Sequence, residues 1–484
     1  MMNPDSLRLT RRALLSGAGA GAAWAVVPPA RADVAPPAQL RVDTRVLEVK
    51  GKAATVLGIV DADGRSGVNK IYDGHFRASL TNRLAEETLV HWHGLTPPVT
   101  QDGVPMLSGP ALKPGETADY DFPTRDAGTH WMHSHMGLQE QMLLAAPLII
   151  RESKSPLVDE QEHVVMLHDF TFRDPREILA ELQAGGGGHA AHAGHGAMAN
   201  GTMDHSTMDM ASVAGMANDI SFDAFLANDR TLDDPDVVRV EKGGRIRLRI
   251  INACAASNMW IDTGTLDAEL IAVDGHSVQP VKGRRFPLAI AQRADIRLNL
   301  PQGAGAWPVL FKVEGSAGQA GIVLTAGGAA VTRISGLGEV QPALDLSMEY
   351  LLKPLGKLPE TAVSKTEMVM LTGGGADYVW GLNGKASMHD VLFRVREGER
   401  YEIMFHNMTG MAHPMHLHGH YFKVVGLGMD RIDGALRDTI LVPVGGIVTI
   451  QFDADNPGTW PLHCHHLYHM NAGMMGTLAY ASAA

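Results

Sequence analysis

The sequence contains few cysteines and few aromatic side chains for its length. Only 2 of its 484 residues are Cys, and only 6% are Phe, Trp or Tyr. Two cysteines cannot form the disulfide framework of a small secreted scaffold. Basic residues are also in the minority, with 41 Lys and Arg against 53 Asp and Glu. Nucleic-acid binding depends on a basic surface, so we expect no nucleic-acid partner.

A long apolar run is missing after the N-terminal segment, so we expect no membrane span in the mature chain. The first 32 residues instead combine paired arginines at positions 11 and 12, a Gly- and Ala-rich apolar centre and an A-x-A exit at 30–32. This order is typical of a cleaved signal peptide, and the paired arginines indicate the twin-arginine route. A membrane anchor is the alternative, which the prolines and glycines disfavour. We therefore expect a periplasmic protein, and a monomer.

Strand-forming runs recur along the mature chain, whereas long helical periodicity is rare. The runs are Glu162–Phe172, Val237–Asn252, Asp295–Pro301, Leu392–Arg396, Tyr401–His406 and Ile447–Asp453. Gly, Pro and Asp-Gly turns separate them, and this spacing predicts an all-β chain of β-sandwiches.

An internal repeat divides the chain into three parts. GTHWMHSH at 128–135 aligns without gaps with GTWPLHCH at 458–465, and HWHG at 91–94 aligns with HLHG at 416–419. A third copy, GAWPVLFK at 305–312, has no metal-binding side chains at the matching positions. We predict three related sandwiches over 33–155, 156–340 and 341–484, with liganding capacity in the first and the last.

One segment breaks this pattern. Residues 184–217 contain GGGG at 185–188, followed by four His and five Met among Ala, Gly, Ser and Asp. These residues cannot pack a core, so we expect a mobile loop. Thioethers and imidazoles are ligands for copper, and the loop could bind an extra ion.

Four His-x-His pairs stand out among the 23 histidines. They are His91 and His93, His133 and His135, His416 and His418, and His463 and His465. Residues i and i+2 of a strand point to one face, so each pair would present two imidazoles side by side. Eight imidazoles exceed the needs of one ion. Their repeated frames predict a cluster of several ions, with half of the ligands supplied by the first domain and half by the third.

A second constellation surrounds the fourth pair. Cys464 is followed by His469 at +5 and Met474 at +10, and His413 precedes the third pair by three residues. Two His, one Cys and a weak axial Met are the ligands of a type 1 blue-copper site, which transfers electrons. Because Cys464 is flanked by the fourth pair, a short backbone path would join this copper to the cluster. Ser134 holds the matching place in the first domain, so we expect no such site there.

Together these motifs resemble those of the multicopper oxidases, over essentially the whole mature chain. The matching motifs are HWHG at 91–94, HSH at 133–135, HPMHLHGH at 413–420 and HCHHLYHMNAGMM at 463–475. The resemblance implies three cupredoxin-like Greek-key β-sandwiches and four copper ions, of which one is type 1, one is type 2 and two form a type 3 pair. By position, the type 1 ligands would be His413, Cys464, His469 and Met474, the type 2 ligands His91 and His416, and the type 3 ligands His93, His133, His135, His418, His463 and His465.

The resemblance also implies a reaction. Electrons taken from a reductant at type 1 copper would pass through Cys464 to the cluster, where dioxygen is reduced to water. Asp102, in the turn after the first motif, matches an acid that such enzymes use near the cluster, although an Asp-Gly turn is the plainer interpretation. A second acid often follows the last type 1 histidine, but here that residue is Met470.

The chain looks most like the periplasmic cuprous oxidases of bacterial copper tolerance. The Met/His-rich segment and Met411, two residues before His413, favour Cu(I) as the reductant. Two features depart from that branch: Thr409 stands where an acid is often found, and the Met-rich insert lies in the middle domain. A laccase acting on phenols is the alternative, and a copper-sequestering or structural protein is a third hypothesis. Other histidines, His406 among them, are expected to be ordinary core or surface residues.

Overall fold

The computed structural model describes residues 36–152, 159–186, 218–356 and 361–481. The predicted signal peptide and nearly all of the Met/His-rich segment lie outside these ranges. Residues Pro37–Ala484 cluster into one unit. In the part of the chain that is described, no helix is long and apolar enough to cross a membrane.

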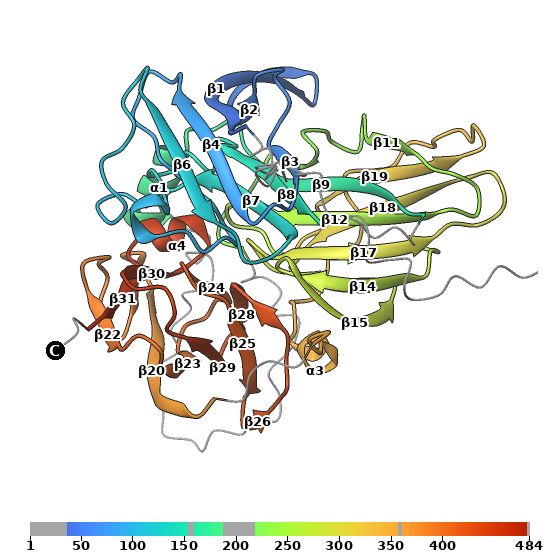
Figure 1. Cartoon of the computed structure of the whole chain (residues 1–484). Coiled ribbons are helices and arrows are strands. Elements are labelled where there is room, and N and C mark those ends of the chain that lie inside the picture. The colour runs from blue at the N-terminus through green and yellow to red at the C-terminus, as the bar shows by residue number, and fades with distance from the viewer. Residues whose placement is uncertain (1–35, 153–158, 187–217, 357–360, 482–484) are drawn as a thin grey trace, which may run out of the picture. The chain divides into compact units, whose positions relative to one another are not determined.

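The strands of the described residues form six sheets, which pair around the three largest hydrophobic cores. Figure 1 shows the strands coloured in chain order, from blue through yellow to red. The first pair contains β1 (Ala38–Val49), β2 (Lys52–Asp61), β3 (Val68–Ile71), β4 (His75–Asn82), β5 (Val90–His91), β6 (Thr117–Pro123), β7 (Gly128–Ser134) and β8 (Ala145–Arg151). Its sheets run β2-β1-β4-β6 and β3-β8-β7-β5, and Phe76, Trp92 and Phe122 lie buried between them.

The second pair of sheets is formed by the middle of the chain and encloses its own hydrophobic core. It contains β9 (Gln161–Phe170), β10 (Ala224–Ala227), β11 (Asp236–Arg239), β12 (Arg245–Asn252), β13 (Met259–Asp262), β14 (Ala268–Val273), β15 (His276–Gly283), β16 (Arg285–Leu288), β17 (Arg293–Asn299), β18 (Gly305–Val313) and β19 (Gln319–Ala326). The orders are β10-β9-β12-β17-β14-β15 and β11-β19-β18-β13-β16. Phe286 and Phe311 are fully buried in this core.

The third pair surrounds the core that holds Cys464 and Met474. It contains β20 (Val363–Gly374), β21 (Val379–Leu382), β22 (Val391–Val395), β23 (Arg400–Asn407), β24 (His413–Leu417), β25 (Phe422–Leu427), β26 (Asp430–Arg431), β27 (Leu436–Arg437), β28 (Thr439–Val442), β29 (Ile447–Asp453), β30 (Thr459–Cys464) and β31 (Met475–Tyr480). The orders are β21-β20-β23-β29-β25-β26, with β27 beside β25, and β22-β31-β30-β24-β28.

Helices are few and short among the described residues. They are α1 (Pro175–Glu181), α3 (Ser347–Leu351), α4 (Leu467–Asn471), the 3₁₀ turn η1 (Val99–Gln101) and the π-helical turn η2 (Leu182–Gly186). The all-β class predicted from the sequence is therefore confirmed. The predicted domain limits at 155/156 and 340/341 stay a prediction.

The predicted strand runs correspond to strands, with one correction. The run 237–252 is two strands, because β11 ends at Arg239 and β12 begins at Arg245. Between them the chain turns through Gly243, whose φ of 68° lies in the left-handed region that glycine adopts readily. The apolar residues on both sides of the turn hid it from the sequence pattern.

The internal repeat occupies one equivalent strand in each sheet pair. Its three copies lie on β7, β18 and β30. Each of these strands lies between the strand that follows it in the chain and an earlier one. The neighbours are β8 and β5 for β7, β19 and β13 for β18, and β31 and β24 for β30. In the middle copy, Phe311 is buried in the core and Lys312 pairs with Asp262 at 2.6 Å. The repeat therefore marks a structural position, and only the outer copies carry imidazoles there.

Candidate metal centre

The four His-x-His pairs lie at the ends of strands. The first histidine of each pair is one of the last two residues of β5, β7, β24 or β30, and the second lies just beyond the strand. The two imidazoles of each pair still lie side by side, as expected, with ring centroids 5.6, 5.8, 4.6 and 5.5 Å apart in chain order. In the first and third pairs the chain turns at the next residue, Gly94 or Gly419, whose φ values are 87° and 69°.

Strand register brings the pairs together in two halves. β5 and β7 are antiparallel neighbours, with His91 opposite His133. β24 and β30 are also antiparallel, with His416 opposite His463. One half of the site therefore comes from the first sheet pair and the other from the third, as the repeat predicted.

The two halves meet ring to ring. The ring centroid of His93 lies 3.9 Å from that of His416, and the two rings are stacked. The centroid of His91 lies 4.0 Å from that of His418. All eight paired histidines are buried. Residues more than 300 positions apart in sequence thus form one buried imidazole cluster.

Ligand atoms in this cluster lie within 4.8 Å of one another in small groups. These groups are His91, His93 and His416; His93, His133 and His465; His135, His418 and His463; and His91, Asp102 and His418. A fifth group, of His413, Cys464 and His469, shares no residue with these four, although Cys464 lies between His463 and His465 in the sequence. Several ions could be held, rather than one.

The hydrogen bonds of the imidazoles fit metal binding. His91 donates from Nδ1 to the backbone oxygen of Asp102 (2.9 Å), and His416 donates from Nδ1 to that of Asp438 (2.7 Å). His133 donates from Nδ1 to the backbone oxygen of Ser134 (3.1 Å), and the same nitrogen lies 2.8 Å from a carboxylate oxygen of Glu140. In each case the other ring nitrogen, Nε2, is buried without a hydrogen-bond partner. An anchored nitrogen opposite a free one is typical of metal-ligating histidines.

Burial also keeps these rings in the form that binds metal. It lowers the pKa of His133, His135 and His416 well below the usual range, and neighbouring imidazoles lower it further. Burial lowers the pKa of His463 to about 3. A neutral imidazole has a free lone pair, so no proton has to be displaced when a metal binds.

The second constellation predicted from the sequence is also assembled. Sγ of Cys464 lies 3.5 Å from Nδ1 of His413 and 3.9 Å from Nδ1 of His469. The two Nδ1 atoms are 3.2 Å apart. Met474 is fully buried in the same core, and its backbone oxygen accepts from the amide of Cys464 (3.0 Å). Burial raises the pKa of the Cys464 thiol, so a bound cation is needed to favour the thiolate.

Three models of the multicopper oxidase family match the chain, over residues 68–155, 161–333 and 360–484. The multicopper oxidase MmcO of Mycobacterium tuberculosis is 30% identical over 413 residues, which are 83% of this chain and 78% of that one. The chain belongs to the multicopper oxidase family. It is therefore an oxidoreductase of a copper-dependent family, as its motifs indicated.

Relatives with different names are similar over the same length. Copper resistance protein A of Escherichia coli is 27% identical and aligns with 82% of this chain and 84% of its own. Laccase-4 of Trametes villosa is 25% identical, with 82% and 81% covered. Among solved structures, a multi-copper oxidase from Pseudomonas thermotolerans superposes with a TM-score of 0.70 at 23% identity, covering 93% of this chain and all of that one. A laccase from Botrytis aclada gives 0.72 at 20% identity, with 92% and 89% covered. The structural likenesses show the shared fold.

Asp102 lies where the sequence placed it, beside the cluster. Its side chain is buried, and its Oδ2 accepts from Nδ1 of His418 at 2.8 Å. It thus joins His91, through its backbone oxygen, to a histidine of the other half. The following residue, Gly103, has a φ of 79°, and a Cβ there would lie 1.8 Å from the backbone oxygen of Val90. The Asp-Gly turn and the contact with the cluster are therefore both real.

A carboxylate that the sequence analysis missed lies on the other side. Glu140 is buried, with one oxygen 2.8 Å from Nδ1 of His133 and the other 3.9 Å from Nδ1 of His465. Burial raises its pKa well above the usual range, and Asp169 adds to the shift. Its place five residues after the second His-x-His pair was the available signal. Only the structure shows that this acid faces the cluster. The position after the last type 1 histidine, where an acid was looked for, holds Met470 instead.

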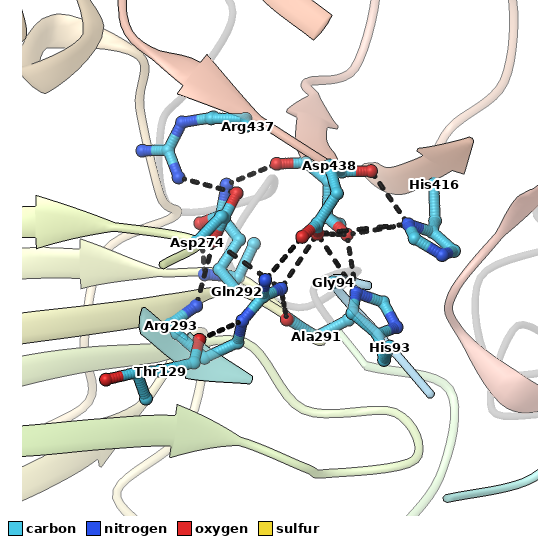
Figure 2. Close-up of polar contacts among 12 residues, drawn as sticks. His93, Gly94, Thr129, Asp274, Ala291, Gln292, Arg293, His416, Arg437 and Asp438 are labelled. Atoms are coloured by element: carbon cyan, nitrogen blue, oxygen red, sulfur yellow. Dashed lines mark hydrogen bonds and ion pairs between the residues drawn. The ribbon is translucent and has the colours of Figure 1, made fainter. Parts of the chain in front are cut away.

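A second missed group is the buried pair of Arg293 and Asp438, shown in Figure 2. One carboxylate oxygen of Asp438 accepts from Nε2 of His93 (3.0 Å) and from Nη1 of Arg293 (2.7 Å), and the other contacts Nη2. Arg293 also donates to the backbone oxygen of Thr129 (3.2 Å). Because these residues come from all three sheet pairs, the ion pair ties the pairs together directly behind the cluster. A Cβ at Gly94 would lie 2.5 Å from Nη2 of Arg293, so glycine is required for this approach.

The third missed residue covers the edge of the cysteine-containing site. The side chain of Asp219 is buried, and one of its oxygens lies 3.4 Å from Nε2 of His469. Burial opposes its ionisation, but His466 and His469 lower its pKa well below the usual range. Tyr378 donates to it at 2.5 Å, and Trp380 lies over the His469 ring, with centroids 4.1 Å apart. On the other ligand, Thr409 accepts from Nε2 of His413 at 2.7 Å.

Proposed function

We propose that this protein is a periplasmic cuprous oxidase that couples the oxidation of Cu(I) to the reduction of dioxygen to water. The assignment of ligands follows the groups described above. We assign His413, Cys464, His469 and Met474 to type 1 copper, His91 and His416 to type 2 copper, and His93, His133, His135, His418, His463 and His465 to a type 3 pair. Free imidazole nitrogens, a buried thiol and a buried thioether suit copper in both its oxidation states.

When bound, copper would accept electrons singly from the reductant and deliver four of them to dioxygen. The chain contributes the connection between the two sites, because Cys464 is bonded on either side to a histidine of the cluster. Nδ1 of His463 donates to the backbone oxygen of Cys464 at 2.9 Å, which fixes this ring relative to the cysteine. Asp102 would hold and release the protons that dioxygen reduction requires, since its Oδ2 is in direct contact with His418.

The covered edge of the type 1 site is the observation that favours Cu(I) over a phenol. His413 and His469 are both fully buried, and their outer nitrogens face Thr409 and Asp219. A phenol needs an open imidazole edge on which to lie, whereas a single ion needs only a ligand nearby. The carboxylate of Asp219 supplies the negative charge that a cation requires. Relatives named for copper resistance support the same choice.

A laccase acting on phenols is the second candidate, and the laccases among the relatives favour it. A protein that only sequesters copper is the third. Complete ligand groups argue against it, because storage does not need a cysteine bonded between two cluster histidines. Export by the twin-arginine route, proposed from the paired arginines at 11 and 12, would place any of these in the periplasm.

Oxygen uptake distinguishes the three candidates. We expect the copper-loaded protein to consume dioxygen rapidly with Cu(I) and slowly with a phenol. A variant lacking 184–217 should consume dioxygen more slowly than the full chain when Cu(I) is scarce, and at the same rate when Cu(I) is abundant. Cys464→Ser should abolish the blue absorption and both activities, which controls for oxidation by copper in solution. Faster turnover with the phenol would identify a laccase, and turnover with neither reductant would identify a sequestering protein.

A further inference from the structure

The outer face of the sheet that contains β20 and β23 has an unusual composition. In β20, Val369 and Leu371 point into the core, whereas Met368 and Met370 are 58% and 39% exposed. A strand with one face in water normally alternates apolar with polar residues. Here the outward residues carry thioether side chains, so exposure to solvent alone does not explain why methionine occupies these positions.

The neighbouring strand continues the pattern. In β23, Ile403 and Phe405 are buried, whereas Met404 and His406 are partly exposed on the opposite face. The two strands are parallel, and their register pairs Met368 with Met404 and Met370 with His406.

These four side chains stand at the corners of one small rectangle. Paired residues of adjacent strands are about 4.8 Å apart, and successive outward residues of one strand are about 6.6 Å apart. Methionine has three rotatable bonds and adapts to irregular contacts. Three thioether sulfurs and one imidazole can therefore converge above the sheet.

The surroundings leave these groups available. Among the described residues, the imidazole of His406 makes no hydrogen bond or ion pair. The nearest outward carboxylate on β23, Glu402, is held by Arg431 (2.5 Å) and also accepts from Thr366 (3.3 Å). The donor groups that remain free are thioethers and an imidazole. Ca²⁺ and Mg²⁺ prefer oxygen ligands, so this set does not suit them.

We propose that Met368, Met370, Met404 and His406 form a binding site for a soft monovalent cation, Cu(I). Thioethers select Cu(I) among the common biological metals, and a neutral imidazole completes the set. The site shares no residue with the buried groups around Cys464 or with the segment 184–217. The proposal concerns the binding of a cation and not its oxidation. It therefore goes beyond the oxidase function, and it holds whichever reductant the enzyme uses.

The chain that leaves this site leads to a type 1 ligand. Two residues after His406, the amide of Met408 bonds to the backbone oxygen of Leu371 (3.0 Å), and its side chain is 60% exposed. The next residue, Thr409, accepts from Nε2 of His413. A cation bound on this face would lie at the end of the sheet that adjoins the buried cysteine site.

The test uses the full-length, copper-loaded protein with ¹³C-labelled methionine methyl groups and Ag(I), which has the charge and ligand preference of Cu(I) but is not oxidised by the enzyme. We expect the methyl resonances of Met368, Met370 and Met404 to shift together as one equivalent binds. Anaerobic competition for Cu(I) against a chromophoric chelator gives the affinity. If these three methyl groups do not respond, or if only other methionines respond, the proposal is wrong.

Matched variants separate ligation from simple exposure. Replacing the three sulfurs by Met368→Leu, Met370→Leu and Met404→Leu keeps the side-chain size and should weaken binding at this site at least about tenfold, or about 1.4 kcal/mol. Met106→Leu, on the first domain at 65% exposure, should change nothing. Unchanged affinity in the triple variant, with the blue absorption confirming a folded protein, would overturn the proposal.

Discussion

The ion pair between Arg293 and Asp438 offers the sharpest test of how the three sheet pairs are held around the cluster (Figure 2). The side chain of Arg293 is 0% exposed and that of Asp438 is 2% exposed. Asp274 keeps a second cation, Arg437, at 3.1 Å. Replacing Arg293 by Met therefore leaves one buried carboxylate, that of Asp438, without its cation.

Breaking a buried ion pair from one side costs about 3–5 kcal/mol, because the remaining charge stays desolvated. We expect Arg293→Met to lower the free energy of unfolding of the copper-free protein by about this amount. The double variant Arg293→Met/Asp438→Asn removes both charges, while the asparagine oxygen can still accept from Nε2 of His93. It should therefore be more stable than the single variant.

Denaturant unfolding followed by tryptophan fluorescence measures both variants. Trp131 is a suitable reporter because its ring is stacked on His133, with centroids 4.3 Å apart. The reasoning would be refuted by a loss below about 1 kcal/mol in the single variant, or by a double variant that is no more stable than the single one. Copper content after reconstitution is a second readout, since Asp438 orients both His93 and His416.

Three further changes test individual carboxylates. Asp102→Asn keeps the acceptor for His418 but removes the proton site, so the blue absorption should persist while oxygen uptake falls about 10²–10⁴-fold; unchanged uptake would contradict this role. Glu140→Leu removes the carboxylate beside Nδ1 of His133 and should weaken copper retention about 10–100-fold in chelator competition, and equal retention would count against it. Asp219→Asn removes a negative charge beside His469 and should raise the reduction potential of the type 1 copper; a redox titration of the blue band that shows no rise would contradict the assignment.

The sequence could predict the chemistry of the site because the relevant pattern is local. Each His-x-His pair spans three residues, and Cys464 lies inside one of the pairs. The repeat also predicted which segments correspond, and β7, β18 and β30 have equivalent neighbours in their sheets. What the pattern did not predict was that the second histidine of each pair lies beyond its strand. The two rings of each pair nevertheless stay within 5.8 Å of each other, centroid to centroid, so the local spacing was a sufficient guide to the pairing.

The surroundings of the imidazoles were decided by the tertiary structure alone. Asp438 is 345 residues from His93, and Arg293 is 145 residues from Asp438. Such contacts depend on which strand ends meet when the sheet pairs pack, and no local periodicity records that. The same holds for Asp219, a plain acidic residue in the sequence that lies against His469 in the fold. The sequence by itself determined that paired imidazoles occur in matched frames on an all-β chain. The packing of the sheets decided which acids orient those ligands and which edge of the cysteine site is covered.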